Sequence, residues 1–148
     1  MIKFSYDTQE YDFKSLFCEW LNTDDLTKLH NQKKYPVLTR EADMYMHWNQ
    51  IYYKRWREDS SIEDLYLKFL EAVIKPRFGE EIIYQELPDI RIHLPENVAV
   101  GEFHKDKTYR DVKWAEKVNE LNYFVPLTKS YDTNTMWAET EEDKGDYI

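Results

Sequence analysis

The spacing of apolar residues divides the chain into a helical first half and a strand-like second half. Up to about residue 80, apolar side chains recur every three or four positions, which is typical of helices with one buried face. This spacing predicts helices in 10–21, 39–56 and 60–79, and a shorter helix capped by Thr23 or Asp24. The expected buried residues are Phe13, Leu16, Phe17, Trp20, Leu21, Leu26, Leu29, Met44, Trp48, Ile51, Tyr52, Ile62, Leu65, Tyr66, Phe69, Val73 and Ile74.

The helix in 60–79 has the clearest signals at its two ends. Ser60 and Glu63 match a capping box, in which a hydroxyl and a carboxylate accept hydrogen bonds from the free backbone N–H groups of the first turn. Pro76 and Gly79 are expected to end the helix, because proline cannot continue the hydrogen-bond pattern and glycine tolerates the turn that follows.

After Gly79 the apolar period shortens to about two, which predicts β-strands. The strand-like stretches are separated by proline, asparagine, glycine or charged turns, and they cover 81–87, 89–94, 97–104, 120–127 and 134–139. With three glycines in the whole chain, no flexible linker is visible. We therefore expect one α+β domain over 1–148, with a helical layer in 1–80 packed on a mostly antiparallel sheet formed by 81–148.

Charge and cysteine content exclude several classes of protein. The 20 Lys and Arg residues are outnumbered by 29 Asp and Glu, and the net charge of −9 argues against a nucleic-acid-binding surface. Cys18 is the only cysteine, which excludes an intrachain disulfide and a cysteine-based zinc cluster. No apolar run approaches the length of a membrane span, and the acidic N-terminus is unlike a signal peptide, so a soluble cytoplasmic protein is expected.

His104 and Asp106 are the best candidates for metal ligands. Alternate side chains of a strand point to the same face, so these two residues can present an imidazole nitrogen and a carboxylate oxygen to one ion. Two histidines and one carboxylate are the ligands of non-haem Fe(II) oxygenases. The alternative interpretation is that both residues are polar groups on a solvated turn.

The words around this pair resemble a known family. "YQELPDIRIHLPENVAVGEFHKDKTY", "ELNYFVPLT" and "NTMWAE" are similar, in this order, to the iron- and 2-oxoglutarate-dependent oxygenases, and most similar to a branch of streptomycin-biosynthesis proteins and related phage and bacterial sequences. The resemblance runs from about Tyr84 to Tyr147 and implies a double-stranded β-helix, a cupin-like jelly roll, which would be incomplete here.

The resemblance also implies roles for individual residues. His104 and Asp106 match the first two ligands of Fe(II), while Asn122 and Arg91 match positions that could bind the co-substrate 2-oxoglutarate or a small-molecule substrate. The segment 110–119 is charged and departs from the usual family pattern, so it indicates no substrate contacts.

The third iron ligand of the family has no counterpart in this sequence. No histidine follows His104 and no arginine follows Arg110, whereas the family has a late histidine and then a basic residue. If 89–94 and 97–104 form a hairpin, His93 and His104 lie several residues apart along the strands, at about 3.3 Å per residue, which is too far for both rings to bind one ion. Glu102 would lie on the same face of the predicted strand as His104 and Asp106 and could be a ligand, but its carboxylate can equally face solvent.

Three functional hypotheses follow. The chain is expected to be the N-terminal portion of an Fe(II)/2-oxoglutarate-dependent oxygenase that hydroxylates a small molecule. It could instead be a catalytically incomplete module that binds a small ligand or a protein. The open sheet edge of such a module would invite self-association. In a third arrangement, a split or strand-exchanged assembly, a second chain supplies the late histidine.

Overall fold

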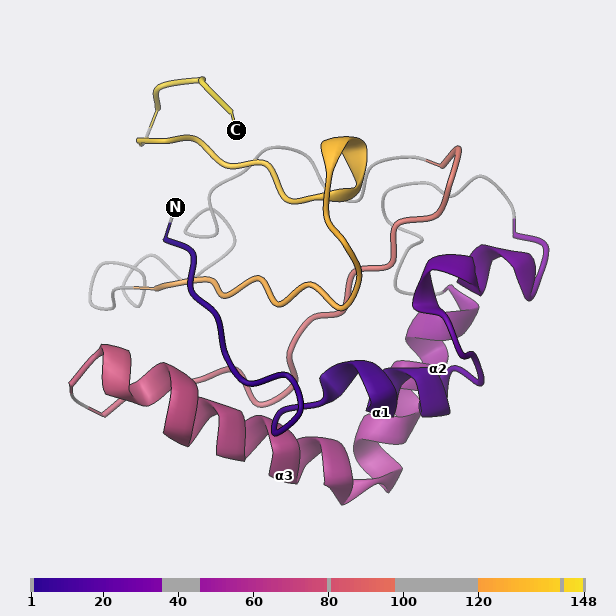
Figure 1. Cartoon of the computed structure of the whole chain (residues 1–148), viewed down its shortest axis with the longest axis horizontal. Coiled ribbons are helices and arrows are strands. Elements are labelled where there is room, and N and C mark those ends of the chain that lie inside the picture. The colour runs from indigo at the N-terminus through magenta and orange to yellow at the C-terminus, as the bar shows by residue number, and fades with distance from the viewer. Residues whose placement is uncertain (1, 36–45, 80, 98–119, 142, 148) are drawn as a thin grey trace.

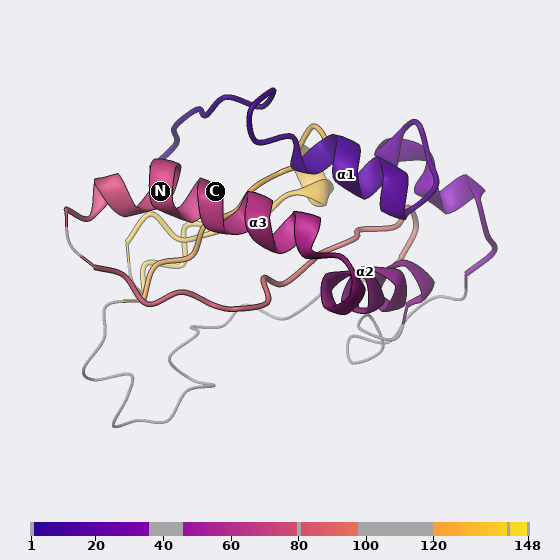
Figure 2. The same ribbon diagram turned by 90° about the horizontal axis from the view of Figure 1, so that it is seen from below.

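The computed structural model describes residues 2–35, 46–79, 81–97, 120–141 and 143–147, and it consists of a helical layer crossed by extended chain (Figure 1). Figure 2 shows α2 nearly end-on beside α1 and α3. No helix in the described ranges is long and apolar enough to cross a membrane. The helical elements are α1 (Phe13–Trp20), a 3-10 helix (Leu26–Asn31), α2 (His47–Glu58), α3 (Ser60–Phe69), a π-helical turn (Leu70–Ile74) and two 3-10 turns (Lys75–Arg77 and Asp132–Asn134).

The predicted helical first half is confirmed where the structure describes it. The residues expected on the inner faces are buried or half-buried, and Trp48 and Ile62 are among the most deeply buried side chains. Gly79 has a φ of 69°, a left-handed conformation that favours glycine and ends the helical segment as expected. Met44, in the predicted helix 39–56, lies outside the described residues.

Two of the helices begin at a different residue from the one predicted. The 3-10 helix is capped by Asp25, whose carboxylate accepts from the Thr27 backbone N–H at 2.9 Å, and not by Thr23 or Asp24. Helix α3 is capped by Asp59, which accepts from the Ser61 N–H at 3.0 Å, so the capping box at Ser60 is wrong by one residue. An aspartate carboxylate satisfies the free N–H groups of a first turn as well as a hydroxyl does.

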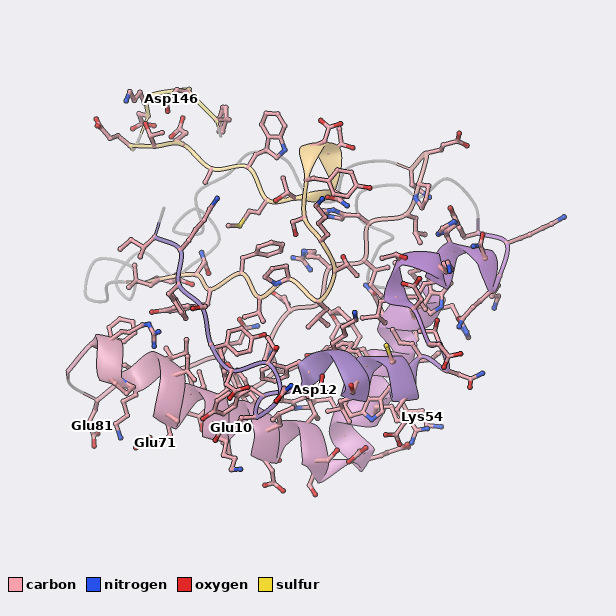
Figure 3. All side chains as sticks on the ribbon, in the orientation of Figure 1. Glu10, Asp12, Lys54, Glu71, Glu81 and Asp146 are labelled. Atoms are coloured by element: carbon pink, nitrogen blue, oxygen red, sulfur yellow. The ribbon has the colours of Figure 1, made fainter. Side chains whose placement is uncertain are left out.

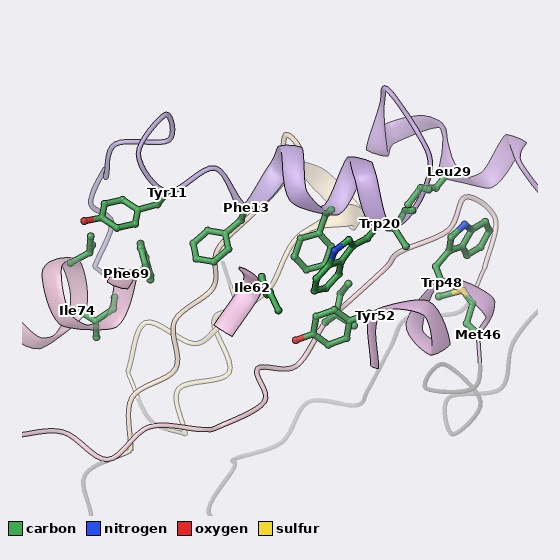
Figure 4. Packing of buried hydrophobic residues seen from close by; sticks show 14 residues of the cluster. Tyr11, Phe13, Trp20, Leu29, Met46, Trp48, Tyr52, Ile62, Phe69 and Ile74 are labelled. Carbon is green, nitrogen blue, oxygen red and sulfur yellow. The ribbon is translucent and has the colours of Figure 1, made fainter. Parts of the chain in front are cut away.

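Aromatic side chains form much of the core, which lies between the helices and the extended chain (Figure 4). The Phe17 and Tyr52 rings stack at 5.6 Å between α1 and α2, and the Phe13 ring meets the Phe69 ring edge-on at 5.4 Å between α1 and α3. Trp20 also donates from its indole N–H to the Asp59 carboxylate at 3.0 Å. These contacts join the three helices through large rings, which bury much apolar area with few flexible bonds.

The predicted sheet is wrong for the described residues. They contain no β-strand, so the expected α+β fold with an incomplete, mostly antiparallel double-stranded β-helix is replaced by helices and unpaired extended chain. The alternation in 89–94 is nevertheless real, because Ile90, Ile92 and Leu94 pack toward the core. One-sided burial produces the same sequence period whether the other side of the segment meets a helix or a sheet. The predicted strand 97–104 lies almost entirely outside the described residues.

Tyrosine hydroxyls provide some of the hydrogen bonds that a sheet would otherwise supply. Tyr52 of α2 donates to the Pro88 carbonyl at 2.6 Å, and Tyr66 of α3 donates to the Gln85 carbonyl at 2.9 Å. Tyr35 donates to the Pro95 carbonyl at 3.3 Å. The Pro88 carbonyl is half-buried and needs a donor, while the bonds to Gln85 and Pro95 lie at the surface. The three bonds connect 81–97 to the helical layer without a neighbouring strand.

We expect Tyr52→Phe to lower the free energy of unfolding by about 1–2 kcal/mol, because the Pro88 carbonyl loses its donor while the buried ring is kept. Urea unfolding followed by tryptophan fluorescence measures the change. The matched control is Tyr84→Phe at an exposed ring, which should change stability by less than about 0.5 kcal/mol. Equal stability of the two variants would contradict this role of Tyr52.

Asp59→Asn should reduce the loss of stability on acidification. Hydrogen bonds from the Ser61 hydroxyl and backbone, and then from Trp20, lower the pKa of Asp59 below 3.8. Its ionised form therefore stabilises the fold above the unfolded pKa, and this contribution disappears as the pH falls through the folded pKa. Asparagine can still cap α3 but does not titrate. Unfolding titrations between pH 6 and pH 2 should show a shallower acid slope for Asp59→Asn than for Asp64→Asn, a change on the same helix.

Candidate functional site

The predicted iron ligands His104 and Asp106 lie outside the described residues, as do Glu102 and the segment 110–119. In the parts of the chain that the structure does describe, no three or more His, Cys, Asp or Glu side chains come together in a group that could hold a metal ion. The iron site therefore stays a prediction from the sequence. What the structure places are the two residues expected to contact the co-substrate.

Arg91 and His93 lie on the outward side of the extended segment 81–97. Both side chains are exposed, while the alternate residues Ile90, Ile92 and Leu94 face the core. The Arg91 guanidinium donates one hydrogen bond to the Ile90 carbonyl at 3.2 Å, which holds the base of the side chain against its own backbone. The guanidinium has further donors that can bind a carboxylate.

Arg91 and His93 are also electrostatically coupled. Loss of hydration around the ring and then the positive charge of Arg91 lower the pKa of His93 below 6.5. The imidazole is therefore neutral at pH 7, while the guanidinium keeps its charge. The neutral imidazole still has one N–H donor, and a donor beside a fixed cation is suited to binding a small anion.

Asn122 lies on the second extended segment, 120–131, and its side chain is exposed. The neighbouring Tyr123 anchors this part of the chain, since its ring lies edge-on to Phe4 at 6.1 Å and to Phe78 at 6.4 Å. The Arg77 guanidinium covers the Phe4 ring at 3.8 Å. These aromatic contacts fix the position of the backbone next to Asn122. Asn122 and Arg91 lie on two separate extended segments, 120–131 and 81–97.

Two hollows are present on the described surface. The first, of about 390 Å³, is lined by Glu71, Lys75 and Glu81 among others, and Glu71 holds the Lys75 ammonium at 2.9 Å and so neutralises it. The second, of about 310 Å³, lies between residues 6–14 and 126–129. We call it the Tyr6–Lys129 hollow; it contains none of the residues that sequence analysis predicted for a site.

Arg91→Gln should raise the pKa of His93 toward 6.5 without reaching it, because the guanidinium charge is removed while the loss of hydration remains. The titration of the His93 ring proton signal by NMR measures this. Arg77→Gln removes an arginine that lies over Phe4 and should leave the His93 titration unchanged. The coupling would be disproved by an unchanged His93 pKa in Arg91→Gln.

Comparison with known proteins gives one relative. The chain is 30% identical over 145 residues to "Streptomycin biosynthesis protein StrG" of Streptomyces griseus, and the match covers 96% of this chain and 66% of that protein. The chain thus spans just under two thirds of the relative's length. No family model and no solved structure matches it. Nearly all of this chain is therefore similar to a streptomycin-biosynthesis protein. The likeness to oxygenases rests only on the short sequence motifs described above.

Proposed function

We propose that this chain forms part of an Fe(II)- and 2-oxoglutarate-dependent oxygenase that hydroxylates a small molecule. The observation that carries the proposal is the tripeptide His104-Lys105-Asp106, whose imidazole and carboxylate would be two of the three ligands of such an iron site. Similarity to a protein named for streptomycin biosynthesis supports a role in small-molecule metabolism.

Each residue would have a separate task. Iron bound with 2-oxoglutarate and O2 supplies the oxidant for hydroxylation of a C–H bond. His104 and Asp106 would hold the metal, and the exposed Arg91 guanidinium would bind a carboxylate of 2-oxoglutarate. Asn122 would donate a hydrogen bond to the co-substrate or the substrate. The third ligand would come from sequence beyond the match, since about one third of the relative's length has no counterpart in this chain.

A second candidate is a module that binds a small ligand or a protein without catalysis. One observation favours it: the extended segments in the described ranges contain no β-strand, whereas the iron site of the oxygenases is expected in a double-stranded β-helix. Metal binding separates the two candidates, because only the oxygenase requires His104 and Asp106 to act together on one ion.

Anaerobic Fe(II) binding by the purified chain tests the proposal. Removal of an iron ligand in His104→Ala or Asp106→Ala should weaken Fe(II) binding at least about tenfold, as measured by equilibrium dialysis. The matched control is Asp64→Ala, which removes an exposed carboxylate from α3 and should leave the affinity unchanged. Fe(II)-dependent release of succinate from 2-oxoglutarate provides a second, separate measurement.

Fe(II) binding and succinate release together distinguish the oxygenase from the binding module. Ligand-dependent Fe(II) binding supports the oxygenase whether or not the chain alone releases succinate, because the third ligand is absent from its sequence. If His104→Ala, Asp106→Ala and the unchanged chain bind Fe(II) equally, neither residue is a ligand and the binding module is the better assignment.

A further inference from the structure

The N-terminal segment meets the second extended segment before it enters the helical layer (Figure 1). We call residues 2–6 the N-terminal strap. Its Phe4 ring lies edge-on to the Tyr123 ring at 6.1 Å, and the Arg77 guanidinium lies over the Phe4 ring at 3.8 Å. The Phe78 ring also lies edge-on to Tyr123, at 6.4 Å. The strap thus joins the segment 120–131 to the residues that follow α3.

The end of the strap nearest α1 is held firmly. The Tyr6 ring lies edge-on to the buried Phe69 ring at 5.0 Å. Directly after the strap, the Asp7 carboxylate accepts hydrogen bonds from two backbone N–H groups of the turn that follows, at 2.8 and 3.2 Å. Asp12, labelled in Figure 3, then caps α1. The strap therefore leaves the helical layer from a fixed position.

The contact at the other end of the strap is small and open to solvent. Phe4 and Tyr123 are 40% and 38% exposed, and neither ring belongs to the buried core, whereas Val125 packs against it. In the described ranges, no backbone hydrogen bond joins residues 3–5 to residues 123–125. Exposed contacts without backbone hydrogen bonds are among the first to open in a folded protein, so this contact can be lost while the helices stay folded.

We propose that the N-terminal strap is a releasable clasp that keeps residues 121–124 ordered against the helical layer. When Phe4 lies against Tyr123, the backbone of 121–124 has one position. When Phe4 moves away, this stretch loses its order up to Val125, where packing on the core holds the chain. Asn122 lies within the stretch, so the strap determines whether its side chain is held in place. This proposal does not depend on the oxygenase, because neither its evidence nor its test involves a metal or a co-substrate.

Nuclear magnetic relaxation of the 15N-labelled full chain measures the order of each backbone N–H. We expect order parameters above about 0.8 for residues 121–124 in the unchanged chain, and below about 0.6 in Phe4→Ala, because the ring contact is lost. Phe4→Tyr keeps the ring and should keep the order. The matched control is Ile2→Ala, which removes an apolar side chain that is 91% exposed in the same strap and should leave residues 121–124 unchanged.

The reciprocal variant distinguishes a clasp from general loosening of the fold. Tyr123→Ala removes the other ring, so it should lower the order parameters of residues 3–5 while those of α3 stay as in the unchanged chain. Low order at 121–124 in the unchanged chain would overturn the proposal, as would equal order in Phe4→Ala and Ile2→Ala. A loss of order in α3 as large as that in 121–124 would also overturn it, since the strap would then not open separately from the helices.

Discussion

Hydrogen bonds from tyrosine hydroxyls to backbone carbonyls connect the extended chain that contains Arg91 to the helices. The three bonds join residues 19, 36 and 60 positions apart, so each closes a different loop of the chain. A tyrosine can do this because its ring packs in the core while its hydroxyl reaches the edge of the core. In the same segment the side chains of Ile90 and Ile92 pack toward the core, while those of Arg91 and His93 are exposed.

How much of the fold could be predicted depends on which interactions are local. Helical spacing located α1, α2 and α3 because each buries a stripe that its own sequence defines, as Ile62 and Phe69 show. The caps were misplaced by one or two positions because several residues able to cap stand together near Asp25 and Asp59. The sheet was predicted wrongly because alternation at Ile90 and Ile92 reports which side is buried and does not report what covers it.

The candidate functional residues also divide into those that a local sequence pattern indicates and those that only the folded chain brings together. Arg91 was selected from its place in the predicted strand 89–94, and the structure places it, exposed, on an extended segment that is not a strand. Its role in binding a co-substrate stays a prediction. The Tyr6–Lys129 hollow had no signal in the sequence, because its walls come from opposite ends of the chain and no spacing rule relates Lys14 to Lys129. The tyrosine bonds were missed for the same reason: the Tyr-rich stretch of α2 predicted packing, and only the folded chain shows that Tyr52 reaches Pro88.

For the binding of small anions, the charge near a site matters more than the net charge of the chain. A chain of net charge −9 should repel anions at long range, and yet the residue proposed to bind 2-oxoglutarate, Arg91, is an exposed cation. Screening at physiological ionic strength limits charge effects to about 8 Å, so a nearby guanidinium or ammonium outweighs the distant carboxylates. At His93 the largest cause of the lowered pKa is loss of hydration, and the second is the charge of Arg91, although most charges in the chain are negative. The acidic composition therefore argues against an extended polyanion such as nucleic acid, which needs many cations in a row, but it leaves room for a small anion that needs only one or two.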